Sequence, residues 1–207
     1  MSLIRKVVPS EYQEACIGDF GESVVPGDID YGQYGFCLRG KTGIGKTHMA
    51  AALAREYMNP EHPHTIVSEV RICGEFSRYA YENDRFVWIS VPSLLSRIRS
   101  TFGNQRSRES EHDILMEMIG SKLMILDDLG SEKSSDFSAS TLYAIISERR
   151  NWRKPTIVTT NQTLKEIASW EPRIASRLAE MATIRLPNVD RRAMRAQEAA
   201  RRQKGMG

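Results

Sequence analysis

Eight consecutive residues near position 40 carry the clearest chemistry in the chain. From Gly40 to Thr47 the sequence reads GKTGIGKT, which matches the pattern G-x-x-x-x-G-K-[ST] at every fixed position. Glycines let backbone N–H groups turn inward around an anion, Lys46 can reach the outer phosphates of a nucleotide, and the Thr47 hydroxyl can bind Mg²⁺. A glycine-rich turn with an exposed lysine is the alternative, but a strand pattern before the loop and a helical pattern after it favour phosphate binding. The expected phosphate contacts are Gly40, Thr42, Gly43, Ile44, Gly45, Lys46 and Thr47.

Two carboxylates follow an apolar segment about 80 residues later. Leu123–Leu126 is apolar, and Asp127 and Asp128 come directly after it. If this segment is a strand beside the loop, Asp127 can hold the Mg²⁺ shell and Asp128 can orient or deprotonate an attacking water. Such a pair alone also fits an ordinary turn after a strand. Behind a complete phosphate-binding loop, it indicates nucleotide hydrolysis.

A third polar group ends another apolar segment, PTIVTTN. Asn161 is its last residue, where the side chain could hydrogen-bond a γ-phosphate or a water. It could also cap the helix expected at Leu164–Trp170, and the two roles are compatible. A strand inserted between the loop strand and the carboxylate strand is typical of the additional-strand P-loop ATPases, as distinct from nucleotide kinases.

Two arginines stand four residues apart in the segment RIASRL. On a helix Arg173 and Arg177 share one face, which is normally solvated or salt-bridged. In a ring-shaped ATPase the same placement lets one arginine reach the γ-phosphate of a neighbouring subunit, an effect worth about 10³–10⁵ in rate.

Apolar runs alternate with helical patterns along the chain, which predicts an α/β fold with a parallel sheet to position these groups. We expect strands at 36–38, 85–91, 122–126, 156–159 and 183–186. We expect helices at 46–57, 92–102, 113–119, 138–152, 164–170 and 172–181. The helical spacing of apolar residues also favours a further helix within 60–84, and the tail after residue 186 is expected to be helical.

Composition and charge narrow the class of protein. A chain of 207 residues with 41% hydrophobic and 27% charged residues fits one globular domain, not a disordered or fibrous chain. The chain lacks an apolar run near the roughly 20 residues of a membrane span, a signal-peptide core, and any C-x-x-C pair, so we expect a cytoplasmic protein without a membrane partner. The net charge of +3 conceals a net +5 in residues 185–207. That tail is either a solvated terminus or a contact for nucleic acid or an acidic partner.

Taken in order, these motifs resemble the AAA+ helicase loaders of the DnaC/DnaI type and their relatives, the IstB transposition helpers. The likeness rests on GKTGIGKTHMAAALA, LMILDDLG, PTIVTTN and RIASRL and covers about residues 10–192. It implies a three-layer P-loop NTPase of the AAA+, additional-strand class, with a five-stranded parallel sheet and no full helical lid domain. The implied organisation is an N-terminal segment (1–34) as a candidate partner contact, an ATPase core (35–187) and a basic tail (188–207).

The resemblance also assigns roles to residues. Lys46 and Thr47 become the Walker A ligands with His48 beside them, Asp127 and Asp128 the Walker B pair, Asn161 sensor one and Arg177 an arginine finger acting in trans, with Arg173 in support. Arg192 is our choice for sensor two, with Arg191 next. The two helices within 92–120 resemble an insertion that touches single-stranded DNA, where Arg97 and Arg99 would meet phosphates and Phe102 would stack on a base. The alternative there is an amphipathic helix with exposed arginines.

Three features depart from the family pattern. Asp128 stands where many AAA+ proteins have glutamate, one methylene longer. Only about 35 residues precede the first strand, whereas typical loaders carry a separate helicase-binding domain there. The segment Pro60–Asp84 is longer than a usual connection, and is either a partner contact or a surface insertion.

The function expected from this resemblance is that of an ATP- and Mg²⁺-dependent loader. It would bind a DnaB-type replicative helicase and single-stranded DNA and self-assemble into an open ring or spiral, in a bacterial or bacteriophage-infected cell. One alternative is an IstB-like ATPase that assists a transposase on duplex DNA. Others are a small-molecule P-loop kinase, which the carboxylate pair and Asn161 argue against, and a nucleotide-switched binding module with negligible hydrolysis.

Overall fold

The computed structural model describes residues 7–20, 34–58, 86–103, 109–132, 134–184 and 186–191. Within them, five parallel strands form one sheet in the order β2-β3-β4-β1-β5. The strands are β1 (Gly35–Arg39), β2 (Phe86–Ser90), β3 (Leu123–Leu129), β4 (Thr156–Thr160) and β5 (Ala182–Ile184). The helices are η1 (Ser10–Tyr12) and η2 (Ile17–Phe20), both 3-10, and α2 (Lys46–Tyr57), α4 (Val91–Arg99), α5 (Glu111–Gly120), α6 (Asp136–Asn151), α7 (Leu164–Trp170) and α8 (Pro172–Ala179).

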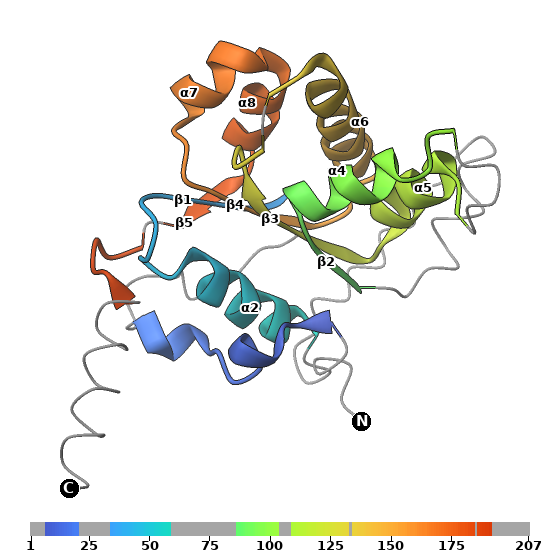
Figure 1. The fold of residues 1–207 in the computed structure, drawn as a ribbon. Helices are drawn as coiled ribbons and strands as arrows, with labels where there is room; N and C mark the ends of the chain where they lie inside the picture. Colours follow the sequence, from blue (N-terminus) through green and yellow to red (C-terminus); the bar gives the residue numbers. More distant parts are fainter. Residues whose placement is uncertain are drawn as a thin grey trace, which may run out of the picture.

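Helices cover both faces of this sheet and make three layers. In Figure 1, α2 and the two 3-10 helices lie below the sheet, and α4 to α8 lie above it. Successive side chains of a strand point to opposite faces. Met124 and Leu126 of β3 therefore pack under α4 to α8, while Leu123 and Ile125 pack against the α2 side. This arrangement confirms the expected three-layer α/β fold with a five-stranded parallel sheet.

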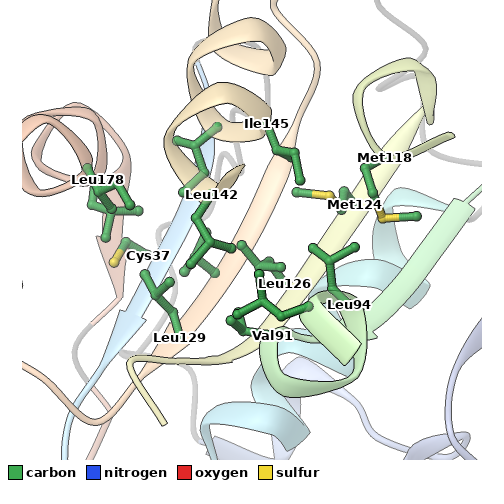
Figure 2. Close-up of a cluster of buried hydrophobic side chains, with 14 of the residues drawn as sticks. Cys37, Val91, Leu94, Met118, Met124, Leu126, Leu129, Leu142, Ile145 and Leu178 are labelled. Carbon is green, nitrogen blue, oxygen red and sulfur yellow. The ribbon is translucent and has the colours of Figure 1, made fainter. Parts of the chain in front are cut away.

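The core on the α4-to-α8 side joins the helical insertion formed by α4 and α5 to the rest of the domain. Figure 2 shows Leu94 of α4 and Met118 of α5 beside Met124 and Leu126 of the sheet, with Leu142 of α6 packed further along. All five side chains are buried. The expected helical insertion between the second and third strands thus packs through apolar residues onto the strand that carries the aspartates.

The sheet order brings the polar strand ends together. β4 lies between β1 and β3, with Leu38 of β1 opposite Thr159 and Leu126 of β3 opposite Val158. Because all strands run parallel, the loop after β1, the aspartates of β3 and Asn161 after β4 meet at one edge. The inserted strand that distinguishes the additional-strand class is therefore present.

The expected boundaries of α4 were wrong at both ends. Val91 opens the helix instead of closing a strand, because the Ser90 side chain caps the helix by accepting a hydrogen bond from the Ser93 N–H. The helix ends at Arg99, and Phe102 lies in the following turn. α2 and α7 have their expected bounds, and the other helices and strands β1, β4 and β5 differ by one or two residues at an end.

β3 extends three residues beyond its expected end at Leu126. It runs through Asp127 and Asp128 to Leu129, and its pairing with β4 shifts between Leu126 and Leu129. Two residues of β3 thus oppose the single Thr159 of β4, which is a β-bulge. Asp127 and Asp128 therefore belong to the strand, and the bulge points their side chains in different directions.

Some expectations fall on residues that the structure does not describe. The further helix within 60–84 and the tail from residue 192 lie outside the described ranges. The expectation of a helical tail directly after residue 186 was wrong for residues 187–190, which are described and are not helical. Among the described residues, no helix combines the length and apolar character that a membrane crossing requires.

Candidate nucleotide-binding site

The phosphate-binding loop connects β1 to α2, as its sequence predicted. Gly43 has φ +88, and a Cβ built on it would lie 2.6 Å from Oδ1 of Asp190, so a side chain there would be strained in backbone and space alike. The loop ends at Gly45, the N-cap of α2. Its backbone therefore delivers the N-terminus of α2, with its free N–H groups and positive dipole end, to the edge of the sheet.

Lys46 sits at the centre of the site and is only 6% exposed. Its ammonium donates hydrogen bonds to the carbonyls of Gly40 at 2.9 Å and Lys41 at 2.8 Å, and to Oδ1 of Asn161 at 2.6 Å. The last bond joins the loop to the end of β4, across 115 residues of sequence. Loop, lysine and Asn161 thus form one unit.

Asn161 is not the cap of α7. That position belongs to Thr163, whose side chain accepts from the Glu166 N–H while the Glu166 carboxylate accepts from the Thr163 N–H. Asn161 is exposed and lines the pocket described below. The capping alternative is therefore excluded, and the amide faces the site.

Asp127 is the buried member of the carboxylate pair. Its Oδ1 accepts hydrogen bonds from the Thr159 hydroxyl at 2.6 Å and from the Thr47 hydroxyl at 3.3 Å. Burial raises the pKa of Asp127 above its usual value, while the hydroxyl of Thr159 and the charge of Lys46 oppose that rise. Asp127 and Thr47, the two expected metal ligands, are therefore in contact.

Asp128 differs from Asp127 in exposure and in backbone conformation. It is exposed, and its φ of 59° places it in the left-handed region. Its N–H donates to the Thr159 hydroxyl at 2.9 Å, and its carbonyl accepts from the N–H and hydroxyl of Ser131. The bulge therefore turns Asp127 into the structure and leaves the Asp128 carboxylate open to the pocket.

These groups line a pocket of about 490 Å³. Its lining residues are Glu11, Tyr12, Thr42, Gly43, Gly45, Lys46, Thr47, His48, Asp128, Ser131, Asn161 and Arg191. Ligand pockets in proteins have about this volume. Gly40, Ile44 and Asp127 belong to the same loop and strand but do not line the pocket.

Residues that the sequence did not reveal close the pocket from the N-terminal side. Glu11 and Tyr12 of η1 contribute to its wall, and Nε2 of His48 lies 2.6 Å from Oδ2 of Asp19 in η2. Partial burial opposes ionisation of Asp19, but hydrogen bonds from the Cys16 N–H and His48 hold its pKa at about 2. His48 thus lines the pocket and also bonds Asp19 of η2. No periodic pattern or motif near residue 19 signals these contacts.

The structure places Arg191 at the site, whereas Arg192 lies outside the described residues. The Arg191 N–H donates to the Gly43 carbonyl at 3.0 Å, and its guanidinium donates to the Asp19 carbonyl at 2.7 Å. The guanidinium also stacks 3.9 Å from the centre of the Phe20 ring. Of the two sensor-two candidates, Arg191 is therefore the one with an observed position in the pocket wall.

Arg173 and Arg177 lie on α8, outside this pocket. Arg173 pairs with the buried Glu171 through Nε at 2.8 Å and Nη2 at 2.7 Å, and lies 4.4 Å from the centre of the Tyr143 ring. Arg177 donates to Glu180 at 3.2 Å, and its pKa is raised by hydrogen bonding to Tyr143 and Glu180. Neither arginine belongs to this chain's own nucleotide site.

The expected DNA-facing residues have different surroundings. Arg97 of α4 is paired with Glu109, which precedes α5, and with Glu117 within α5, both at 2.7 Å, so the two ion pairs hold α4 against α5. Arg99 is exposed and lies 5.4 Å from the centre of the Phe137 ring, whose edge meets Phe102. Phe102 is 52% exposed. Phe137 of α6, which the sequence analysis missed, thus joins Arg99 and Phe102 in one surface cluster.

The donor set suits Mg²⁺ bound with phosphates. Thr47 and Asp127 supply oxygen atoms, and in the described part of the chain no three His, Cys, Asp or Glu side chains gather into a metal cage. Mg²⁺ is usually held by one or two carboxylates together with substrate phosphates, which matches this arrangement.

Comparisons with known proteins agree with the site. No family model matches the chain. It is 24% identical over 132 residues to the replicative helicase loader DnaC of Escherichia coli K12, a match that covers 64% of this chain and 44% of the relative. The chain thus spans less than half the length of the curated relatives it matches.

Two solved structures share the fold. A crystal structure of the DnaC helicase loader is 25% identical with a TM-score of 0.53, over 76% of this chain and 82% of that one. The replication initiator DnaA, bound to AMPPCP and single-stranded DNA, is 14% identical with a TM-score of 0.59, over 89% of this chain and 53% of that one. With a complete phosphate-binding loop, the carboxylate pair on β3 and the inserted β4, this chain has the fold of the AAA+ P-loop ATPases and is similar to the DnaC helicase loaders.

Proposed function

We propose that this chain is the ATPase core of a replicative helicase loader, which binds ATP and Mg²⁺ at the phosphate-binding loop and hydrolyses ATP in an assembled state. The single observation that carries the ATPase part is the 2.6 Å contact between Lys46 and Asn161, beside the Asp127 and Asp128 pair. One cluster then combines the phosphate-binding loop, two candidate metal ligands and a carboxylate that can orient the attacking water. A nucleotide kinase would need no carboxylate open to water at this place.

The residues divide the reaction between them. Backbone N–H groups of the loop and the Lys46 ammonium bind the β- and γ-phosphates, and Thr47 and Asp127 would hold Mg²⁺. Bound Mg²⁺ would supply charge neutralisation between the phosphates. The Asp128 carboxylate orients the attacking water and accepts its proton, and the Asn161 amide fixes the γ-phosphate or that water.

Arg177 completes the reaction from a neighbouring subunit. It lies on α8 outside this chain's own pocket, and its side chain is 26% exposed, so a second copy can reach it from outside. An arginine supplied in trans stabilises the charge that develops on the transferred phosphoryl group. The proposed assembly is therefore an open ring or spiral in which each chain lends Arg177 to the next.

Single-stranded DNA would meet the surface cluster of Arg99, Phe102 and Phe137. Arginine supplies phosphate contacts, and the exposed Phe102 ring, supported by the half-buried Phe137, offers a stacking surface for bases. The DnaA structure that shares this fold is bound to single-stranded DNA, which supports this part of the proposal. The name of the DnaC relative supports a DnaB-type helicase as partner.

Hydrolysis is tested by ATP turnover with purified protein, with and without single-stranded DNA and without any phosphate acceptor. Turnover should occur without an acceptor, and Lys46→Ala should abolish it, whereas Lys165→Ala, a change at an exposed lysine of α7, should not. Asp128→Asn tests hydrolysis alone, because asparagine also tolerates the left-handed backbone at this position. Turnover unaffected by Asp128→Asn would favour a nucleotide-switched binding module instead.

The partner is tested by co-purification with a DnaB-type helicase and with a transposase, each with and without ATP. Recovery of the helicase, stronger in one nucleotide state, is expected. Recovery of the transposase alone would contradict the loader role and favour an IstB-like ATPase, while leaving the ATPase part intact.

A further inference from the structure

We propose that Gln162 is a positioning residue that links a chain's own phosphate site to the arginine which that chain lends to its neighbour. Gln162 directly follows Asn161 after β4. Its side chain bonds the loop behind Asp128 at one end and the corner between α7 and α8 at the other. The inference rests on the proposed role of Arg177 in trans.

One end of the Gln162 amide holds the Asp128 loop. Its Nε2 donates to the carbonyl of Gly130 at 3.0 Å, two residues after Asp128. Gly130 has φ +83, and a Cβ built there would lie 2.6 to 2.8 Å from the three terminal heavy atoms of the Gln162 side chain. The backbone of the loop therefore packs directly against the amide and cannot move independently of it.

The other end holds the helix corner. The Trp170 Nε1–H donates to Oε1 of Gln162 at 2.9 Å. Trp170 is the last residue of α7, and α8 begins two residues later at Pro172. The intervening Glu171 is buried and accepts hydrogen bonds from Arg173, so the corner is held as a rigid piece.

The chemistry of the two contacts fixes the amide orientation. A carbonyl only accepts and an indole N–H only donates, so Gln162 must turn its NH₂ to Gly130 and its oxygen to Trp170. Glutamine satisfies both partners at once, and glutamate cannot satisfy the carbonyl. A second connection joins the backbone of Gln162 to the end of β3. The Thr160 hydroxyl accepts a hydrogen bond from the Gln162 N–H and donates one to the Leu129 carbonyl.

These contacts form a continuous path from the phosphate site to α8. Asn161 bonds Lys46, its neighbour Gln162 bonds both the Asp128 loop and Trp170, and α8 carries Arg177 beyond that corner. In Figure 1, α7 and α8 stand together over the β4 and β1 end of the sheet. A shift of the Asp128 loop or of Asn161 when phosphates bind can therefore reach α8 through the Gln162 side chain. ATP in one chain would then set the position of the arginine offered to the next.

Two substitutions of similar size remove the two hydrogen bonds of the Gln162 side chain separately. Gln162→Glu places an oxygen against the Gly130 carbonyl and keeps an acceptor for Trp170. Trp170→Phe removes the indole N–H and keeps an aromatic ring at the corner. Lys165→Ala, on the exposed side of α7, is the matched control for both.

Subunit mixing reads the effect in trans. Arg177→Ala subunits retain the nucleotide site, and Asp128→Asn subunits bind ATP without hydrolysing it and retain the arginine, so a mixture should regain ATP turnover. Adding Gln162→Glu to the arginine-lending Asp128→Asn subunits should reduce the regained turnover about tenfold, because a small misplacement of a catalytic group is costly. Unchanged turnover would overturn the proposal, since a role confined to the chain's own site would act only in the Arg177→Ala subunits.

If the mixture regains no turnover, that result contradicts the role of Arg177 in trans but does not test the contacts of Gln162. A second measurement, made within one chain, tests those contacts directly. The indole N–H resonance of Trp170, identified among three tryptophans by Trp170→Phe, should shift on binding of a non-hydrolysable ATP analogue. Gln162→Glu should abolish the shift while the analogue still binds. A shift that persists in Gln162→Glu, or that is missing from the unaltered protein when the analogue binds, overturns the link.

Discussion

The side-chain oxygen of Asn161 accepts a hydrogen bond from the ammonium of Lys46 at 2.6 Å. The bond exists because β4 is inserted between β1 and β3, which brings the end of β4 beside the loop that follows β1. The residue proposed to sense the γ-phosphate is thus already in contact with the residue proposed to bind it. We therefore expect a displacement of Lys46 to move Asn161, and the reverse.

Replacing Asn161 should separate turnover from binding. Asn161→Ala removes one polar group from the γ-phosphate region, which typically costs about 10²-fold in rate. ATP affinity should fall far less than with Lys46→Ala, since the loop N–H groups and Lys46 remain. Single-turnover hydrolysis and equilibrium nucleotide binding measure the two quantities. An affinity loss as large as that of Lys46→Ala would show that Asn161 serves binding only.

Asp127→Asn should make the protein more stable and less active. Burial raises the folded-state pKa of Asp127 above 3.8, so the uncharged form is the one that folding favours. The contribution of the protonated Asp127 carboxyl to the stability of the folded state is fully present below pH 3.8. It is lost as the pH rises through the raised pKa of the folded state. Asparagine avoids that loss and can still accept from the Thr159 hydroxyl.

The unfolding temperature without Mg²⁺ and nucleotide should therefore be higher for Asp127→Asn at pH 7, and the difference should shrink as the pH falls toward 4. Turnover should drop, because one of the two proposed Mg²⁺ ligands has lost its charge. A variant less stable than the unaltered protein at pH 7 would contradict the burial argument. Asp128→Asn, at the exposed neighbour, is the control for stability.

Sequence patterns predicted the architecture and the centre of the site because both depend on local order. Parallel strands were recognisable as apolar runs, and the residues at their ends, Lys46, Asp127 and Asn161, meet wherever such strands lie side by side. Helix positions followed from the spacing of apolar residues, whereas the caps Ser110 and Thr163 were not identified, and Asn161 was named in place of Thr163. Boundaries failed where a cap was overlooked, as at Ser90.

The features of the site that the sequence did not predict depend on contacts between segments far apart in the chain. Such contacts leave no local sequence pattern. Asp19 meets His48 and Arg191 only because the N-terminal turn folds over α2. The bulge that separates the roles of Asp127 and Asp128 is set by pairing with β4. Arg97 looked free on its helix because Glu109 and Glu117 come later in the chain.

Arg177 and Arg173 should fail in different ways. Arg177→Ala should keep ATP affinity in the isolated chain and lower turnover of the assembled protein by about 10³-fold or more. Arg173 instead pairs with Glu171, the residue that joins α7 to α8, so Arg173→Ala should lower the unfolding temperature. Thermal unfolding and turnover as a function of protein concentration distinguish the two. Loss of ATP affinity in monomeric Arg177→Ala would contradict a role in trans.

The surface cluster predicts which arginine contacts DNA. Arg99→Ala should weaken single-strand binding and reduce the slope of log affinity against log salt by about one. Phe102→Ala should weaken binding with little change in slope, because stacking releases no counterions. Arg97→Ala should leave the slope unchanged, since its guanidinium is already paired with two glutamates. Equal slope changes for Arg97→Ala and Arg99→Ala would mean that the glutamate pairs open on DNA binding.

Arg149 of α6 should be the most costly arginine to replace, because it is completely buried. Its guanidinium donates to the Thr156 hydroxyl and to the carbonyls of Met118, Ser121 and Pro155, at 2.6 to 2.9 Å. It thereby fastens the end of α5 to the beginning of β4. Arg149→Met leaves these acceptors buried without a donor, which should lower the free energy of unfolding by about 3–5 kcal/mol.

The neighbouring Arg150 provides the matched comparison, since it bonds Glu180 at the surface and Arg150→Met should cost about 1 kcal/mol or less. Arg149→Lys should recover only part of the loss, because one ammonium cannot reach acceptors that surround a planar guanidinium on several sides. Urea unfolding of the three variants measures these differences directly. Similar losses for Arg149→Met and Arg150→Met would mean that the carbonyls around Arg149 find other donors, and that α5 and β4 are held together mainly by their apolar contacts.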